Sequence, residues 1–192
     1  MKENQKFMKV LALLLCFFLA LLCVQFAVRT LERALFPRRY TEAVQQYSAE
    51  YGVDENLVYA IIRTESGFRT DARSDVDARG LMQITEETFV WIKSKIAPKE
   101  NITFSDLDTP AVNIRFGTYL LSVCLSRYEG DISTAAAAYH SGLGLVDGLL
   151  TDSAYSENGT TLQVFPYDQM NNYVHKVARS YEKYTKLYSK QL

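Results

Sequence analysis

Glu65 is the residue whose type and position most strongly suggest chemistry. It ends the apolar helical stretch in "AIIRTESGF", residues 60–68. The residues at helical spacing before it are all apolar: Leu57, Val58, Ile61 and Ile62. A carboxyl group on that side of a helix is either paired with a base such as Arg63 or Arg69, or kept there with a raised pKa. The sequence leaves both interpretations open at this point.

A raised pKa would suit Glu65 to general-acid catalysis. Burial against Ile61 and Ile62 disfavours the ionised carboxylate, and so does the negative end of the helix dipole at residues 63–66. A carboxyl group that keeps its proton near neutral pH can deliver it to a leaving group. The other acids nearby are Asp71, Asp75 and Asp77, in the polar stretch 67–79. We expect these three to be solvated acids on a long surface loop.

The elements that must position Glu65 are helices. Helical patterns start at Thr41 and at Asp54, a plausible N-cap, and the second ends near residues 66–67. Thr85 opens a helix that runs to Ile96, and Pro110 stands in the first turn of a helix that runs to about Tyr128. Further helices are predicted over 133–140 and 168–188, with a break at "SGLG", residues 141–144. No stretch alternates convincingly with period two, so the predicted fold class is all-α.

An apolar segment precedes this domain. Residues 10–28 are 19 positions without a charge, and a helix of that length spans about 28 Å, close to the ~30 Å hydrocarbon thickness of a bilayer. No small-residue cleavage site follows Val28, which disfavours a cleaved secretory signal. We therefore expect a tail at 1–9, a single transmembrane anchor at 10–28, a juxtamembrane linker at 29–40 and one domain at 41–192.

Charge and cysteine content exclude several classes of function. Residues 1–39 carry seven basic and two acidic side chains, a net +5, which leaves −6 for residues 40–192 out of the total of −1. A net-acidic domain is a poor nucleic-acid binder. Basic residues lie on both sides of the 10–28 segment, so charge does not settle its orientation. Cys124 is alone in the domain, and the two histidines have no Cys/His cluster around them, so we expect neither an internal disulfide nor a metal site.

Several motifs, in order, resemble those of the soluble lytic transglycosylase family, lysozyme-like enzymes that cut peptidoglycan. They are "ESGF", Ser74, "ARGLMQIT", "AAYHSGLG" and "NNYVHKV", and the resemblance covers about residues 45–185. It implies a lysozyme-like domain with Glu65 as the single catalytic acid. It also implies that Ser74 and Gln83 line the sugar cleft, that the Tyr139 hydroxyl faces the catalytic carboxyl, and that Tyr173 is a second cleft tyrosine. No cofactor or metal is implied.

The sequence departs from the family pattern at several positions. His140 replaces the usual asparagine of "AYNAG", and Leu143 replaces a proline that often follows it. Thr85 and Glu86 stand where Met-Pro is more usual, and Gln169 stands where a glutamate is frequent. None of these changes removes the catalytic acid. They leave open the sugar contacts around Thr85, His140 and Gln169.

The resemblance also implies a reaction. Glu65 protonates the leaving oxygen, the N-acetyl group of the substrate supports the developing cation, and Glu65 then deprotonates the muramic acid 6-hydroxyl to close a 1,6-anhydro ring. Two alternatives remain: a muramidase that hydrolyses the same bond with Asp75 or Asp77 as base, or a noncatalytic wall-binding scaffold. The expected partners are peptidoglycan glycan strands and, through the anchor, the membrane, with the domain on the extracytoplasmic side. Protein partners and endo or exo action stay undetermined.

For the remaining side chains near these motifs we expect simpler roles. Gln83 can close a turn instead of binding sugar. Met82, Phe89 and Trp91 are expected to pack in the core, although an aromatic ring can also serve as a surface on which a sugar stacks.

Overall fold

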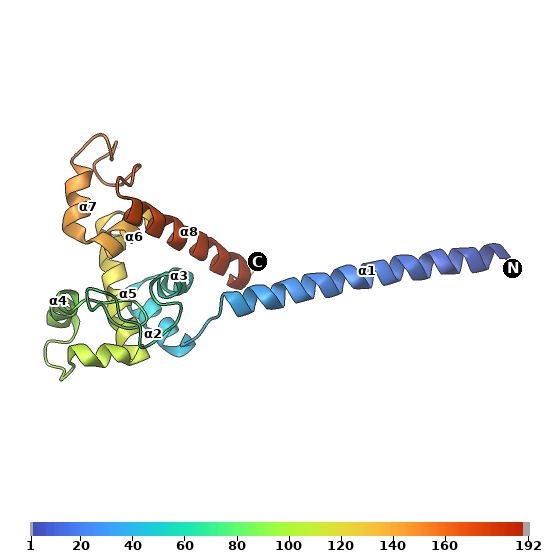
Figure 1. Cartoon of the computed structure of the whole chain (residues 1–192), viewed down its shortest axis with the longest axis horizontal. Helices are drawn as coiled ribbons and strands as arrows, with labels where there is room; N and C mark the ends of the chain where they lie inside the picture. The colour runs from blue at the N-terminus through green and yellow to red at the C-terminus, as the bar shows by residue number, and fades with distance from the viewer. Residues whose placement is uncertain (1, 190–192) are drawn as a thin grey trace. The chain divides into compact units, whose positions relative to one another are not determined.

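The computed structural model describes residues 2–189; Met1, which begins the expected tail, and residues 190–192, which end the expected domain, lie outside this range. The chain divides into two compact units, Met1–Pro37 and Arg38–Leu192. The first contains a single helix, α1 (Lys2–Leu35) (Figure 1). The expected 10–28 anchor therefore lies inside one longer helix, since no helix-breaking residue occurs before Pro37.

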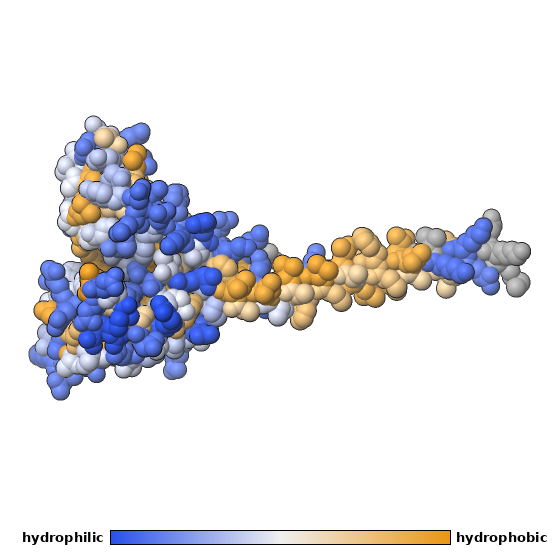
Figure 2. All heavy atoms as spheres, in the orientation of Figure 1, coloured by the Kyte–Doolittle hydropathy of each residue, from blue (hydrophilic) through white to orange (hydrophobic). Residues whose placement is uncertain are grey.

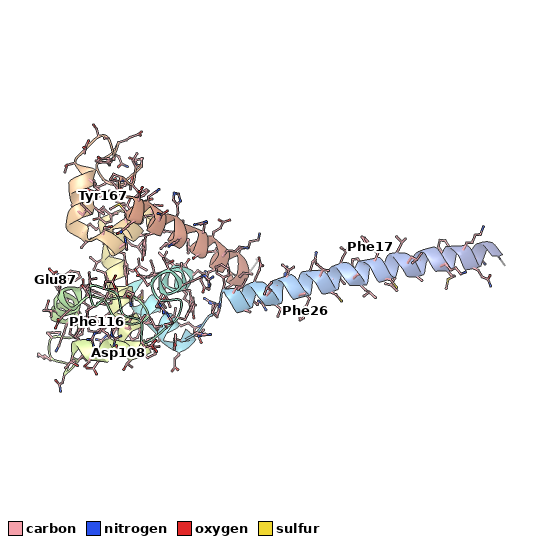
Figure 3. The ribbon with its side chains drawn as sticks, viewed as in Figure 1. Phe17, Phe26, Glu87, Asp108, Phe116 and Tyr167 are labelled. Atoms are coloured by element: carbon pink, nitrogen blue, oxygen red, sulfur yellow. The ribbon has the colours of Figure 1, made fainter. Side chains whose placement is uncertain are left out.

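Apolar side chains cover most of α1. Figure 2 shows them as an almost continuous band along the helix, and Phe17 and Phe26, labelled in Figure 3, are 65% and 75% exposed. The stretch Asn4–Leu35 is long and apolar enough to cross a membrane, judged by length and composition. A water-soluble helix would bury such a face. This helix is the candidate anchor that the sequence predicts.

The second unit is built from helices. They are α2 (Thr41–Tyr51), α3 (Glu55–Glu65), α4 (Glu86–Ile96), η1, a 3₁₀ helix (Phe104–Asp108), α5 (Pro110–Arg127), α6 (Ile132–Ser141), α7 (Leu143–Leu150) and α8 (Asp168–Tyr188). Within residues 38–189 the only β-type pairings are isolated bridges between Arg73 and Arg79 and between Arg79 and Ile84. The expected all-α fold class is confirmed.

Local signals set most helix ends where the sequence predicts them. The Asp54 carboxylate accepts a hydrogen bond from the backbone N–H of Asn56, 2.7 Å away, and Thr85 caps α4 in a similar way. Pro110 is the first residue of α5. The helix α7 was not predicted. Gly142, with φ of 89°, ends α6 as expected. A new helix begins at the next residue and is stabilised by the buried side chains of Val146 and Leu149.

The core surrounds α3 and α5. One face of α3 packs against α8, and α5 contacts α2, α4, α6 and η1 (Figure 1). The four apolar residues that precede Glu65 on its side of α3 are all buried: Leu57, Val58, Ile61 and Ile62. Cys124 is buried as a small core residue. The C-terminal end of α3 therefore presents Glu65 at the edge of this core.

The segment 66–85 is a folded loop that Asn113 of α5 fixes in place. The buried Asn113 side chain accepts a hydrogen bond from Met82 N (2.7 Å) and donates to Arg79 O (2.8 Å) and Leu107 O (2.9 Å). Gly80, with φ of 74°, lies so close that a Cβ there would overlap Asn113 Nδ2 and Leu107 O. The expected loop is therefore irregular, but its second half is tied to the core.

Candidate active site

Glu65 lies at the last position of α3 and has a strongly perturbed pKa. Burial raises the pKa of its carboxyl group from 4.5 to about 7, and a hydrogen bond from Tyr173 opposes part of this rise. The side chain keeps some exposed surface, so a ligand can reach it. Glu65 does not form the alternative ion pair with Arg63 or Arg69, since neither arginine contributes to the shift in the Glu65 pKa. Burial outweighs hydrogen bonding, a balance that the sequence could not decide.

Tyr173 of α8 holds the Glu65 carboxyl. Its hydroxyl donates to Glu65 Oε1 at 2.7 Å, and its ring is almost fully buried. The His140 ring stacks on the Tyr173 ring, with 4.4 Å between centroids and 12° between planes. Burial lowers the pKa of His140, which favours the neutral imidazole. Residues from α3, α6 and α8 thus form one connected group around the acid.

The Tyr139 hydroxyl, which was expected to face the catalytic carboxyl, bonds to the backbone of the 66–85 loop. It donates to the backbone carbonyl of Met82 at 2.8 Å, while the bond to Glu65 comes from Tyr173. Glu65 nevertheless lies close enough to raise the pKa of Tyr139 electrostatically, in addition to the larger effect of burial. Tyr139 therefore lies beside the acid and joins α6 to the 66–85 loop. Of these two tyrosines, Tyr173 donates the hydrogen bond to the acid and Tyr139 does not.

Gln83 and Ser74 both bond within their own loop. Gln83 adopts φ of 50°, and its amide donates to Gly80 O (2.9 Å) and Ala72 O (3.2 Å). This is the turn-closing role that the sequence left as an alternative. Ser74 is exposed, and its hydroxyl accepts from Ala78 N at 3.0 Å. The structure brings neither side chain into a hydrogen bond with Glu65, and both shape the loop beside it.

The three loop acids lie in solvent, as expected. Asp71, Asp75 and Asp77 are exposed, and Asp77 pairs with Arg79 at 3.3 Å. No carboxylate is among the groups that shift the pKa of Glu65. Within residues 2–189, Glu65 is thus a single acid without an electrostatically coupled partner.

Two pockets are lined by residues of the group around the acid, one by His140 and the other by Tyr139. One, of about 540 Å³, is lined by His140, Ser141, Leu145, Pro166, Tyr167, Asp168, Gln169 and Met170. The other, of about 190 Å³, is lined by Glu87, Thr88, Trp91, Leu120, Ala138, Tyr139, Gly142 and Leu143. Figure 3 labels Tyr167 and Glu87, which belong to different pockets.

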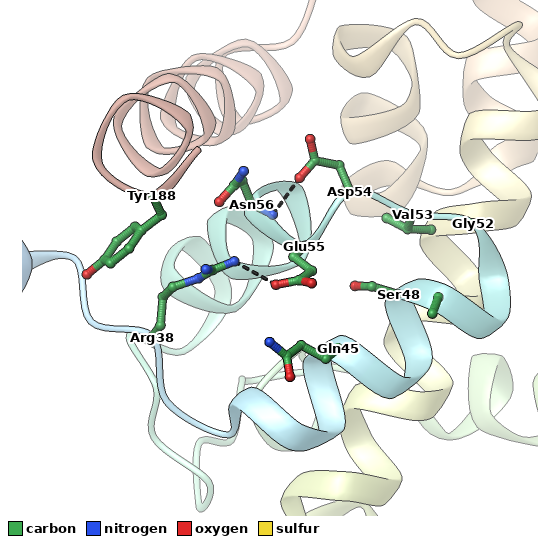
Figure 4. Close-up of a pocket in the computed structure, with 10 residues that line it drawn as sticks. Arg38, Gln45, Ser48, Gly52, Val53, Asp54, Glu55, Asn56 and Tyr188 are labelled. Atoms are coloured by element: carbon green, nitrogen blue, oxygen red, sulfur yellow. Dashed lines mark hydrogen bonds and ion pairs between the residues drawn. The ribbon is translucent and has the colours of Figure 1, made fainter. Parts of the chain in front are cut away.

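A wider, polar pocket lies elsewhere. It measures about 780 Å³ and includes Arg38, Asp54, Glu55 and Tyr188 (Figure 4). Arg38 pairs with Glu55 at 2.7 Å, and its guanidinium lies over the Tyr59 and Tyr188 rings. This pocket is at the N-terminal end of α3, about 15 Å along the helix axis from Glu65. The acid with the perturbed pKa is at the opposite end of the helix, so we do not assign catalysis to this pocket.

Sequence reasoning missed two residues that position the site. Ser66 follows Glu65, and its buried hydroxyl donates to Leu81 O at 2.8 Å and accepts from Phe68 N at 3.1 Å. Asn113, described above, holds Met82, whose carbonyl in turn accepts from Tyr139. The polar Asn113 among the apolar residues of α5 was a visible signal. Its partners Met82 and Arg79, 31 and 34 residues earlier in the chain, were not.

Replacing Tyr173 with phenylalanine is expected to raise the pKa of Glu65 above about 7. The tyrosine hydroxyl bonds to the carboxylate and so favours its ionised form, whereas burial disfavours that form and remains in the variant. The measurement is a carboxyl-¹³C NMR titration of the full chain. Tyr181→Phe is the matched control, because Tyr181 is also on α8 and donates to the acid that caps α3, Asp54, at 2.9 Å. A Glu65 pKa that stays constant or falls in Tyr173→Phe would contradict the assignment.

Comparisons with known proteins match this chain to a single protein family. Residues 42–158 match a family model described as "Transglycosylase SLT domain". Membrane-bound lytic murein transglycosylase C of Yersinia enterocolitica is 37% identical over 116 residues, which cover 56% of this chain and 32% of the relative. The protein of the same name from Photorhabdus laumondii is 36% identical over 116 residues, with the same coverage. The chain thus spans about a third of the length of the curated relatives it matches.

Solved structures agree on the fold. The lytic transglycosylase Slt of Pseudomonas aeruginosa, in an inactive form with a glutamate-to-glutamine substitution, is 30% identical, with a TM-score of 0.69 over 79% of this chain and 24% of that chain. The 70 kDa soluble lytic transglycosylase of Escherichia coli is 23% identical, with a TM-score of 0.74 over 83% of this chain and 26% of that chain. A complex of a 70 kDa soluble lytic transglycosylase with bulgecin A is similarly related.

Proposed function

The chain belongs to the transglycosylase SLT domain family, and on that premise we propose that its domain is a peptidoglycan lytic transglycosylase. It cleaves the β-1,4 bond between N-acetylmuramic acid and N-acetylglucosamine without water. The observation that carries the proposal is Glu65, an acid without a coupled acidic partner within residues 2–189, whose pKa is raised to about 7 by desolvation so that it can hold a proton near neutral pH. The names of the relatives support the same reaction and substrate.

Glu65 acts first as acid and then as base. Its proton goes to the glycosidic oxygen as the bond to the muramic acid C1 breaks, and the substrate's N-acetyl group supports the cationic centre. The muramic acid 6-hydroxyl then bonds to C1 and gives its proton to the Glu65 carboxylate, which restores the acid. The Tyr173 hydroxyl, 2.7 Å from Glu65 Oε1, holds the carboxyl in one orientation for both steps. The reaction consumes no water and needs no second carboxylate.

The digestion products are expected to end in 1,6-anhydro-N-acetylmuramic acid. The 6-hydroxyl already belongs to the bound sugar, so it has an entropic advantage over water. Asp75 and Asp77 are exposed and do not shift the pKa of Glu65, so neither is placed as a base that could activate a water molecule near it. Mass spectrometry of sacculi digested by the full chain in detergent should find muropeptides lighter by one water than those of a muramidase digest of the same sacculi. Reducing ends alone would favour hydrolysis, and no cleavage at all would favour a wall-binding scaffold.

We further propose that α1 anchors the domain in the cell membrane as a single span, with the domain on the extracytoplasmic side. The apolar helix and the membrane-bound relatives support the anchor, and the location of peptidoglycan outside the cytoplasm supports the orientation. Protease added to intact spheroplasts should remove the domain of the full chain while a cytoplasmic marker survives. Complete protection of the domain until lysis would refute this orientation.

A further inference from the structure

We propose that His140 is a positioning residue for the proposed reaction: its imidazole ring covers Tyr173 and thereby keeps the Tyr173 hydroxyl on the Glu65 carboxyl. The inference rests on the proposed function and adds to it a residue that acts through Tyr173 instead of through the sugar. The sequence singled out His140 only as a departure from the usual asparagine of its motif. The structure gives this departure a physical consequence.

The His140 ring lies flat on the Tyr173 ring. The two centroids are 4.4 Å apart and the planes differ by 12°. The helix α6, which carries His140, packs against α8, which carries Tyr173 (Figure 1). The Tyr173 hydroxyl, at the far end of the ring from α8, donates to Glu65 Oε1 at 2.7 Å. A flat ring against the face of a tyrosine opposes the side-chain rotation that would carry the hydroxyl away from Glu65.

His140 also stands between Tyr173 and the pocket of about 540 Å³. The imidazole lines this pocket, whereas Tyr173, which is 6% exposed, is not among the lining residues. One side of the imidazole therefore lies on Tyr173, and other parts of the side chain are exposed. Without the ring, water from the pocket would reach Tyr173 and compete for its hydroxyl. The hydrogen bond to Glu65 would then be weaker, because water screens a bond that is strong in a buried place.

The flat ring is the part of His140 that acts on Tyr173. Within residues 2–189 the ring stacks on Tyr173, and neither ring nitrogen has a hydrogen-bond partner. Burial lowers the pKa of His140, which favours the neutral imidazole. The titratable groups near the ring are Tyr173 of α8 and Asp168, which lines the same pocket, and neither contributes to this shift. Phenylalanine can therefore supply what His140 contributes.

Removal and replacement of the ring test the proposal. His140→Ala should release soluble muropeptides from sacculi about fivefold more slowly, which corresponds to the loss of one aromatic pair. His140→Phe should restore most of the rate. His175→Ala is the matched control and should keep the wild-type rate, because His175 is the other histidine of the chain and is exposed on α8, two residues after Tyr173. A rate for His140→Phe as low as that for His140→Ala would overturn the proposal.

A double-mutant cycle tests whether His140 acts through the Tyr173 hydroxyl. Tyr173→Phe keeps the ring on which His140 stacks and removes the group that bonds to Glu65. In that background His140→Ala should change the rate by less than about twofold, because no hydroxyl is left to position. The same fivefold loss in both backgrounds would refute the positioning role and assign His140 to packing or to direct contact with the sugar. Urea unfolding of each variant confirms that the rates belong to folded chains.

A measurement without substrate separates this inference from the proposed function. In a carboxyl-¹³C NMR titration of the full chain in detergent, His140→Ala should raise the pKa of Glu65 above about 7, in the same direction as Tyr173→Phe. The reason is that a weaker hydrogen bond favours the ionised carboxylate less, while the burial of Glu65 remains. His140→Phe should return the pKa to its wild-type value. An unchanged or lower pKa in His140→Ala would reject the positioning role even if sacculi are cleaved normally. A raised pKa in a chain whose wild type never cleaves sacculi would reject the transglycosylase and leave the action of His140 on Tyr173 standing.

Discussion

Glu65→Gln is expected to reduce glycosidic bond cleavage by about 10³-fold or more, the range that loss of a general acid produces. Glutamine has nearly the same shape and can still accept the hydrogen bond from Tyr173, so only the transferable proton is lost. The measurement is release of soluble muropeptides from purified sacculi. Introducing an acid at position 83 as well, by Gln83→Glu, should not restore cleavage, because the Gln83 side chain bonds to Gly80 O and Ala72 O within its own loop. Cleavage near the wild-type rate in Glu65→Gln would refute the catalytic assignment.

The stability of Glu65→Gln is the internal control for this loss. The folded chain holds the Glu65 proton up to a pKa of about 7, whereas the unfolded chain releases it near 4.5. The free energy of unfolding of the wild type therefore falls as the pH rises between these values, on the order of 2 kcal/mol, and the glutamine variant escapes this fall. Urea unfolding at pH 5 and pH 8 should find the variant at least as stable as the wild type at pH 8. A less stable variant there would mean that misfolding, not chemistry, explains the lost activity.

Asn113→Ala is expected to destabilise the domain by about 3 kcal/mol or more. The substitution leaves the buried N–H of Met82 and the carbonyls of Arg79 and Leu107 without their partner, at about 1 kcal/mol or more each. A cavity adds to this loss. Because small domains are stable by only 5–15 kcal/mol, the urea midpoint should fall clearly. Ser122→Ala on the same helix is the control, since the Ser122 hydroxyl donates only to Tyr119 O of its own helix, and it should change stability by about 0.5 kcal/mol or less.

Loss of the Asn113 side chain should also lower the catalytic activity of the folded domain. The Met82 carbonyl accepts the hydrogen bond from the Tyr139 hydroxyl, so a displaced Met82 releases the Tyr139 ring, which lies near Glu65. At urea concentrations well below its unfolding midpoint, Asn113→Ala should therefore lose a larger fraction of its activity than the fraction of molecules that is unfolded. Activity in strict proportion to the folded fraction would limit Asn113 to a structural role. Gly80→Ala perturbs the same cluster from the other side and should have the same two effects.

The sequence by itself determined the elements that depend on near neighbours. Caps at Asp54 and Thr85 and the proline at 110 act within one helical turn, so helices α3, α4 and α5 begin where they were predicted. The apolar side of α3 follows from its 3.6-residue period, and this placed Glu65 next to the core without any knowledge of the fold. The uncharged stretch 10–28 likewise predicted an apolar helix from its composition.

Only the tertiary structure decided what surrounds Glu65. The hydrogen bond from Tyr173 joins residues 108 positions apart, and the tyrosine of the "AYHSG" motif, Tyr139, turned out to bond Met82 instead. Whether burial or hydrogen bonding controls the pKa depends on how closely α3, α6 and α8 pack, and the half-buried state of Trp91 depends on α5 and the α6–α7 turn. A sequence pattern reports interactions within one or two helical turns. Desolvation and hydrogen bonding at a site are sums over groups that are brought together from the whole chain, and those sums exist only once the chain has folded.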